Sequence, residues 1–394
     1  MAEPVFSVGV STRDDPERAA EEAARAARAG LGDLAATLTL VFATPDLATH
    51  GEEFLGPVHA ALAPEVLLGA TGEAVIGGGR EFEEGPAVAV WAAHLPGADI
   101  LPFRLAARIH GDRVTVAGWP AELSAPDGPG APLLLLADPF TFPADAVLGE
   151  VNSKPEGAWV VGGLASGGGG PGEHRLFHQG DVLHEGAVGA LLRGVAVTPV
   201  VSQGCEPIGP EMVITSATGQ VVEELAGMPA LDKLRTVLTD LDEHERELAS
   251  RGLLAGLVIN ENQPDYGRGD FLVRGIQGGD SDTGALVVGE RVRVGQTMRF
   301  HVRDAASADD DLRHALRRAR AGLAPERPRG GLVFSCNGRG THMFPGPDHD
   351  ATAIADELSA VPTAGIFCNG EIGPVGGKSF LHGFTATMAV FSGG

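Results

Sequence analysis

A repeat within the chain limits the folds that this sequence can adopt. Residues 365–383 read GIFCNGEIGPVGGKSFLHG, so glycines surround one amide, one carboxylate and one lysine. Shifted by 298 residues, this stretch matches ATGEAVIGGGREFEEG (residues 70–85) at four glycines, one glutamate and one phenylalanine. Glycine lets a backbone approach a ligand closely, so polar groups among glycines suit a small-molecule site. A glycine-rich hairpin connection is the alternative for either stretch alone.

The similarity continues upstream at a second offset, 292 residues. It places GGLVFSC (330–336) over TLTLVFAT (37–44), and RRARAGL over RAARAGL. A loop six residues longer, around Arg339 to Pro347, accounts for the change of offset. Similarity at two related offsets indicates a duplicated supersecondary unit. We expect residues 5–91 and 298–391 to form two copies of a β-α-β-α-β-loop-β unit.

A partial third copy is a further hypothesis for residues 132–180. PLLLLADPF (132–140) is similar to the strand before each glycine-rich stretch, and WVVGGLASGGGGPGEHRLFHQG is similar to the stretch itself. Phe177 and Gly180 have the spacing of Phe380 and Gly383.

Strands and helices that alternate in this way predict an α/β fold, mixed and tending to α+β, with mixed sheets. A β-rich middle section follows the first copy, and a helix is expected over 231–250 because its leucines and valine repeat at helical spacing. The chain has 394 residues, which is long enough for more than one core. We expect two domains, residues 1–200 and 201–394.

Composition and charge exclude several classes of protein. No apolar run approaches the roughly 20 residues that a membrane-spanning helix needs. The formal net charge of −23 argues against nucleic-acid binding, which requires clustered Lys and Arg. The first residues lack a basic segment followed by an apolar one, so we expect a cytoplasmic protein. The three cysteines are an odd number and are widely spaced, so we expect them to be reduced and unpaired.

Two polar segments, FSCNGRG and FCNGEIGP, each follow an apolar strand, which predicts that they meet at one edge of a sheet. Arg339 could hold a carboxylate through two hydrogen bonds, and Glu371 could accept from an ammonium group. Together they would suit a zwitterion such as an amino acid. A structural ion pair between Arg339 and Glu371 is an equally weighted alternative. The expected ligand-binding residues are Cys336, Asn337, Arg339, Asn369, Gly370, Glu371 and Lys378.

Cys336 allows two interpretations. It could be a nucleophile, with His342 close in sequence, or a buried small apolar residue, which is the commoner role of cysteine. The first copy has Thr44 at this position. We therefore expect no catalytic residue. No cofactor motif is present in its required context, and no metal-ligand spacing is present. Asp350 is expected to cap the helix that begins near Ala351.

The same motifs resemble the FIST family, named for F-box and intracellular signal transduction proteins. They are QGCEPIGPEMVIT with ELAGMPALDKL (203–234), FSCNGRG, and GIFCNGEIGP followed by FLHGFTATMAVF. STRDD, LLGATGEAVIG and GGLASGGG match the N-terminal FIST domain more loosely, in the right order. The resemblance implies an N-terminal and a C-terminal FIST domain. It also implies a sensory module for small ligands, with amino acids as the proposed class.

Because the chain ends at FSGG without a recognisable output region, we expect a sensor that signals through a partner in trans. A thiol enzyme that uses Cys336 and a protein-interaction scaffold are the alternatives. Saturable binding without turnover would favour the sensor. Product formation that is lost when Cys336 is alkylated would favour the enzyme, and co-purification of one protein would favour the scaffold.

Overall fold

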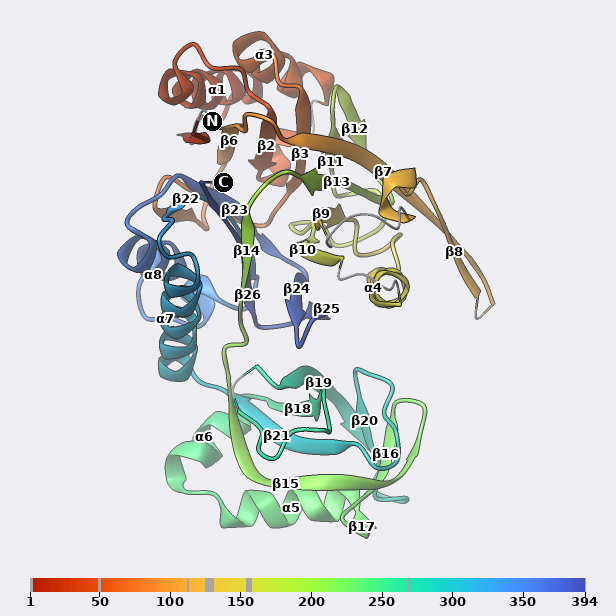
Figure 1. Cartoon of the computed structure of the whole chain (residues 1–394). Coiled ribbons are helices and arrows are strands. Elements are labelled where there is room, and N and C mark those ends of the chain that lie inside the picture. The colour runs from red at the N-terminus through yellow and green to blue at the C-terminus, as the bar shows by residue number, and fades with distance from the viewer. Residues whose placement is uncertain are drawn as a thin grey trace. The chain divides into compact units, whose positions relative to one another are not determined.

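The computed structural model describes residues 3–48, 51–111, 113–124, 131–153, 158–267 and 269–393. Its contacts form two units, residues 1–201 together with 312–394 (unit 1) and residues 202–311 (unit 2). Figure 1 shows the elements of both units. The units do not follow the expected division into 1–200 and 201–394, because the last 83 residues belong with the first unit. Among the helices that the described ranges contain, none has the length and apolar character needed to cross a membrane.

Unit 1 contains three repeats of one strand pattern. The elements of the first repeat are β1 (Val5–Ser11), α1 (Pro16–Leu31), β2 (Leu38–Ala43), α2 (Pro45–Ala48), α3 (Glu52–Leu62), β3 (Val66–Thr71), β4 (Val75–Gly77), β5 (Arg80–Phe82) and β6 (Val88–His94). Those of the second are β7 (Asp99–His110), β8 (Arg113–Ala117), η1 (Ala121–Ser124), β9 (Pro132–Ala137), α4 (Ala144–Asn152), β10 (Trp159–Leu164), β11 (Leu176–His178), β12 (Asp181–Leu183) and β13 (Ala187–Arg193).

The third repeat is interrupted by unit 2. Its elements are β14 (Val197–Ser202), α7 (Ala305–Gly322), β22 (Pro328–Cys336), η2 (Gly340–His342), α8 (His349–Leu358), β23 (Thr363–Cys368), β24 (Glu371–Val375), β25 (Lys378–His382) and β26 (Ala386–Ser392). Its first strand is therefore β14, which neighbours β26. The expected copy over 298–391 began instead with a strand of unit 2, because sequence similarity alone does not reveal an insertion.

The mixed α/β fold class is confirmed, and the repeats exchange hairpins. Each sheet has a parallel pair at its centre: β2 with β3, β9 with β10, and β22 with β23. The hairpin that follows β3 pairs with β23, the one that follows β10 pairs with β3, and the one that follows β23 pairs with β10. Every repeat therefore supplies the edge hairpin of another repeat's sheet.

The third copy exists, with a register different from the expected one. Gln179 and Gly180 form the turn of its hairpin, where the first and last repeats have Gly78–Gly79 and Gly376–Gly377. Phe177 thus lies on the first strand of its hairpin, whereas Phe380 lies on the second. The similarity in spacing was accidental.

One central core joins the three sheets. Phe42 (β2), Trp91 (β6), Phe334 (β22) and Phe391 (β26) are fully buried in it. The rings of Trp91 and Phe391 lie 5.2 Å apart, and those of Phe42 and Phe334 lie 6.2 Å apart in a T-shaped arrangement. Such pairs contribute about 0.5–1.5 kcal/mol beyond their burial. Of the strands in these pairs, β2, β3, β9 and β23 are buried along their whole length, as expected of parallel strands covered on both faces.

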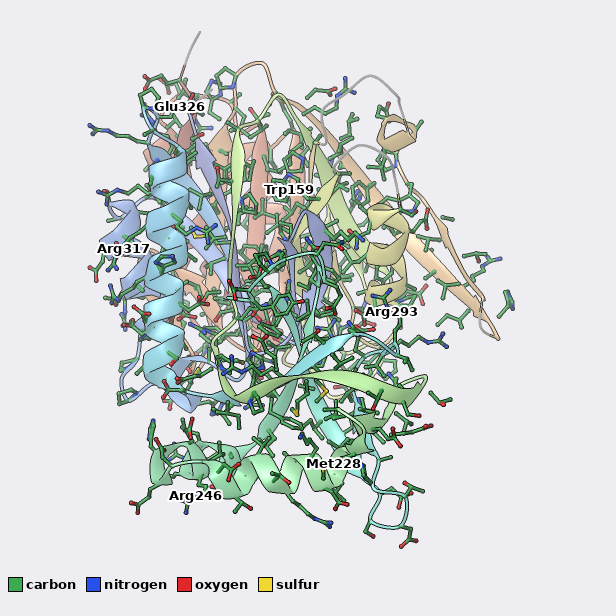
Figure 2. The ribbon with its side chains drawn as sticks, turned by 60° about the horizontal axis from the view of Figure 1, so that its bottom comes forward. Trp159, Met228, Arg246, Arg293, Arg317 and Glu326 are labelled. Carbon is green, nitrogen blue, oxygen red and sulfur yellow. The ribbon has the colours of Figure 1, made fainter. Side chains whose placement is uncertain are left out.

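Helices cover the outer faces of the sheets (Figure 1). The first helix, α1, begins at Pro16 after Asp15, whose side chain accepts a hydrogen bond from the Arg18 N–H. Its buried face consists of alanines and Leu31, and small side chains let the helix lie close to the sheet. On α7, Arg317 lies outward in Figure 2 and forms a 2.7 Å ion pair with Glu357 of α8.

Unit 2 has its own antiparallel sheet and core. Its elements are β15 (Cys205–Thr218), β16 (Val221–Leu225), β17 (Met228–Pro229), α5 (Ala230–Asp240), α6 (Glu243–Arg251), β18 (Leu253–Val258), β19 (Phe271–Gly279), β20 (Leu286–Val288) and β21 (Thr297–Arg303). The expected helix over 231–250 is two helices, because Asp242 caps α6 in a capping box with Glu245. Figure 2 labels Met228 beside α5 and Arg246 on α6.

Candidate functional site

The three repeats bring equivalent connections to one edge of unit 1. In each repeat, a connection leaves the carboxyl end of the second strand of the parallel pair, which is where open α/β sheets place ligands. One backbone hydrogen bond recurs in all three repeats. In each, an N–H near the end of this strand donates to the carbonyl of the residue that precedes a neighbouring hairpin. These bonds join Thr71 to Arg175, Leu164 to Gly370 and Phe367 to Ala74.

The residues two positions after these donors are Glu73, Ser166 and Asn369, and all three line one cavity. The cavity has a volume of about 420 Å³, and its other lining residues are Gly167, Gly168 and Asn337. This volume lies within the roughly 300–1,000 Å³ of small-molecule pockets. Two amides, one carboxylate and one hydroxyl therefore face a space to which all three repeats contribute.

Ser166 ties the three connections together. Its Oγ accepts a 2.7 Å hydrogen bond from the Glu73 N–H and donates a 2.5 Å bond to the Phe367 carbonyl. The next residue, Gly167, has φ of +86°, and a Cβ there would lie 2.5 Å from Pro45. Only glycine fits this close approach without strain. The wall of the cavity is thus fixed by one side chain and one glycine.

A buried pair holds the glycine-rich side of the cavity. Asp138 and His174 are almost completely buried, and their Oδ1 and Nδ1 atoms lie 2.8 Å apart. The His174 Nε2 accepts a hydrogen bond from the Gly168 N–H at 3.3 Å. Asp138 follows β9 directly, so the pair connects the strand end to the loop that lines the cavity.

Asn337 offers an unused acceptor at the cavity. Its backbone N–H donates to the Cys368 carbonyl. Its side-chain Oδ1 is buried and has no hydrogen-bond partner among the residues that the structure describes. A buried polar atom without a partner costs about 1–3 kcal/mol, which a bound donor would recover. Asn369 is exposed and adds a second amide.

Arg339 does not face this cavity. It is fully buried, and its Nε and Nη2 bond to the two carboxylate oxygens of Asp350 at 2.8 and 2.7 Å. Burial acts to lower the pKa of Arg339, and the Asp350 carboxylate more than offsets this, so the pKa is raised. Ser335 and His349 also contact Asp350. Arg339 is therefore part of a structural ion pair.

The expectation that Asp350 caps a helix is wrong, because its carboxylate is bound to Arg339 inside the fold. The helix α8 begins at His349 after Asp348, and Asp350 lies buried in its first turn. Burial tends to raise the pKa of Asp350, but the Arg339 guanidinium lowers it below its ordinary range. Among the described residues, Arg339 forms its ion pair with Asp350 and not with Glu371.

Glu371 and Cys336 form a second buried pair. Glu371 is fully buried, its Oε2 accepts from the Thr385 N–H at 3.1 Å, and a hydrogen bond links it to the Cys336 thiol. Burial raises the pKa of Glu371 well above its ordinary range, so it favours the neutral form. Burial, with the nearby Glu371 charge, also raises the pKa of the Cys336 thiol to about 12. Neither side chain lines the cavity described above.

The position of Cys336 is structural in the other two repeats as well. The backbone N–H groups of Thr44, Asp138 and Cys336 each donate to the carbonyl of the residue directly before the last strand of their repeat. These acceptors are Ala87, Gly186 and Thr385, respectively. Thr44 accepts from the Ala87 N–H through Oγ1, and Asp138 bonds to His174. Cys336 and Cys368 form no disulfide among the described residues, although they are in register on adjacent strands.

Gly370 and Lys378, the remaining two expected residues, do not line the cavity. Gly370 is buried with φ of +138°, and its carbonyl accepts from the Leu164 N–H. Lys378 begins β25 and is exposed. The structure thus places two of the expected ligand-binding residues, Asn337 and Asn369, at the cavity.

Sequence reasoning missed Glu73 and Ser166 as site residues. The repeat alignment placed Glu73 over Glu371, which drew attention to the copy that is buried. By the recurring hydrogen bond, however, Glu73 is equivalent to Asn369, because the last repeat has two extra residues before its hairpin turn. Gly72 and Gly370 therefore lie in corresponding connections of two repeats, but not at equivalent positions. Aligning residues 159–180 in the register of the recurring hydrogen bond would have found Ser166.

The fold and the cavity together define an α/β protein of three exchanged repeats with a polar cavity at its strand ends. Comparison with known families matches the FIST N domain to residues 37–228 and the FIST C domain to residues 230–374. An uncharacterized protein of Mycobacterium tuberculosis is 45% identical over 98% of this chain and 99% of its own length. An F-box/LRR-repeat protein of Arabidopsis thaliana is 28% identical over 51% of this chain and 40% of its own length.

The chain belongs to the FIST family, whose domains are sensory domains of signal transduction. Another M. tuberculosis protein, also uncharacterized, is 43% identical over 98% of both chains. Among solved structures, T. maritima PurL complexed with ATP matches with a TM-score of 0.21 at 11% identity, over 99% of this chain and 72% of that chain. So low a score carries no structural argument.

Proposed function

We propose that the chain is a sensor that binds a small zwitterion of the amino-acid class in the cavity at Glu73, Ser166, Asn337 and Asn369. The observation that carries the proposal is the convergence of equivalent positions from all three repeats on one polar cavity of about 420 Å³. A ligand in such a place contacts every repeat at once. Its binding energy is then available to shift the unit between two states.

The chemistry of the lining supports a zwitterion. The Glu73 carboxylate accepts hydrogen bonds from an ammonium group, and the unpartnered Oδ1 of Asn337 adds a second acceptor. The amide N–H₂ groups of Asn337 and Asn369 donate to a carboxylate. Glu73 thus accepts from the ammonium group, which is the role that the sequence suggested for Glu371. The two amides, in place of Arg339, donate to the carboxylate. We propose that a separate protein partner receives the signal.

A thiol enzyme is disfavoured by the chemistry of Cys336. The thiolate is the nucleophile, and a thiol whose pKa is about 12 is almost entirely protonated at neutral pH. Its carboxyl neighbour, Glu371, favours the neutral form and is a poor base. A protein-interaction scaffold would leave the polar cavity without a use, so it ranks behind the sensor.

The test begins with a thermal-shift screen over the amino acids, followed by calorimetric titration of the strongest binder. Glu73→Gln removes the charge that holds the ammonium group. We expect the affinity to fall by about 10- to 100-fold, which corresponds to the roughly 1.5–3 kcal/mol of a charged hydrogen bond.

The matched control is Glu84→Gln, which removes the same charge from an exposed residue outside the cavity. It should bind like the wild type. Equal affinity in Glu73→Gln and the wild type, or no amino acid that raises the melting temperature, would count against the proposal.

A further inference from the structure

Unit 2 has a cavity of its own, of about 310 Å³, at the GCEP motif (204–207). The proposed function makes no use of this motif. Cys205 and Glu206 reach the cavity from the start of β15, Phe271 from the start of β19, and His301 from β21. All the residues that line it belong to unit 2.

His301 gives the cavity a buried acceptor. The side chain is 3% exposed, and its Nδ1–H donates to the Arg299 carbonyl at 3.1 Å. The Nε2 then carries the lone pair, and it has no hydrogen-bond partner among the described residues. Burial lowers the pKa of His301 to about 4, so the ring is neutral at neutral pH and Nε2 accepts.

Two carboxylates add negative charge at the same cavity. Glu206 accepts a 2.8 Å hydrogen bond from the Ser307 hydroxyl, and Asp311 accepts from Ser202 and from the Gln203 N–H at 2.9 and 2.8 Å. Each carboxylate keeps acceptor capacity for a ligand, because two oxygens offer about four lone-pair sites.

The one cation among these lining residues is Arg299. Its guanidinium lies 4.0 Å from the Glu211 carboxylate, which offsets part of its charge. Glu206 and Asp311 then leave the described lining net negative. An anionic ligand would meet repulsion here, and a cation would meet attraction.

Aromatic rings complete the wall. The Phe271 ring lies 5.1 Å from the His301 ring in an edge arrangement, and the Tyr266 ring lies 5.9 Å from Phe271. Aromatic faces attract cations through their quadrupole. Acceptors, net negative charge and aromatic surface together are the features that recognise an ammonium group.

We propose that this cavity of unit 2 binds a small organic ammonium ion, of the class of primary amines and diamines. This second site is separate from the zwitterion site of unit 1, with which it shares no residue. Its volume lies at the small end of the usual range for ligand pockets, so the ligand is compact.

Calorimetric titration of the full chain with 1,4-diaminobutane tests the proposal, with butyrate as the anion of similar length. The diamine should bind saturably and butyrate should not. Glu206→Gln should weaken the diamine at least 10-fold, whereas Glu243→Gln, which removes one exposed charge from α6, should bind it like the wild type. Binding of butyrate, absence of diamine binding, or an unchanged affinity in Glu206→Gln would each overturn the proposal.

Alkylation of Cys205 gives a second, independent measurement. Cys205 lines the cavity and is partly exposed, whereas Cys336 and Cys368 are buried and serve as internal references. Saturating 1,4-diaminobutane should slow the reaction of Cys205 with iodoacetamide, followed by peptide mass spectrometry. An unchanged rate would contradict binding at this cavity. Glu73→Gln should leave both diamine measurements unchanged, so the two proposals fail independently.

Discussion

At the scale of single residues, burial decides which of the polar side chains in the repeated loops are structural. Arg339 and Glu371 have the charges that a zwitterion needs, but both are fully buried, one against Asp350 and the other against Cys336. A sequence shows residue types and spacing but not the partner that a distant element brings, and Asp350 comes from α8. Asn337 and Asn369 were predictable because they follow directly after two adjacent strands.

Arg339→Ala should therefore destabilise the fold. Removing one partner leaves the Asp350 carboxylate buried without its charge partner, which costs about 3–5 kcal/mol. Urea unfolding measures this change in the free energy of unfolding.

The control for this prediction is Arg104→Ala, which breaks an exposed 2.9 Å ion pair with Asp181. An exposed pair contributes about 0–1 kcal/mol, so this variant should unfold close to the wild type. A loss in Arg339→Ala no larger than in Arg104→Ala would show that the buried pair does not stabilise the fold.

At the scale of elements, the repeated glycine stretches form hairpins that pair with a strand of another repeat. The hairpin of β4 and β5 pairs with β23 and also contacts the start of α8. There the Glu81 Oε1 accepts from the Ala351 N–H at 2.9 Å, and the Asp348 side chain accepts from the Glu81 N–H at 2.6 Å. The sequence predicted a loop here and offered a hairpin only as the alternative, and the strands with which the hairpins pair depend on contacts between distant segments.

The stability of this contact should depend on pH through Glu81. Burial, with the nearby Asp350 charge, raises the pKa of Glu81 from 4.5 to about 8. The folded state therefore holds a proton that the unfolded state releases. The stabilisation from this proton is complete below pH 4.5 and is lost as the pH rises to about 8.

Glu81→Gln tests this pH dependence, because the amide stays neutral at every pH. The free energy of unfolding of the variant, relative to the wild type, should rise between pH 4.5 and 8, as measured by urea unfolding at several pH values. Parallel curves for the two proteins across this interval would mean that Glu81 does not titrate in the fold.

At the scale of the whole molecule, the sequence predicted the mixed α/β class and the order of strands and helices in the first repeat. The second repeat was only partly visible, because its hairpin lacks the paired glycines and has Gln179–Gly180 in their place. The insertion of residues 202–311 between β14 and α7 was missed, because sequence similarity alone does not show where a repeat is interrupted. Glu73 and Ser166 could be identified as cavity residues only from the structure, which brings the three connections together.

The central claim is that connections from all three repeats of unit 1 enclose one ligand. Hydrogen–deuterium exchange of the full chain, with and without the strongest amino-acid binder from the screen, tests this claim most directly. The account predicts slower exchange in peptides that cover residues 71–74, 164–169, 336–340 and 368–371 together, with residues 202–311 unchanged. Protection confined to one of these connections, or found only within residues 202–311, would contradict it.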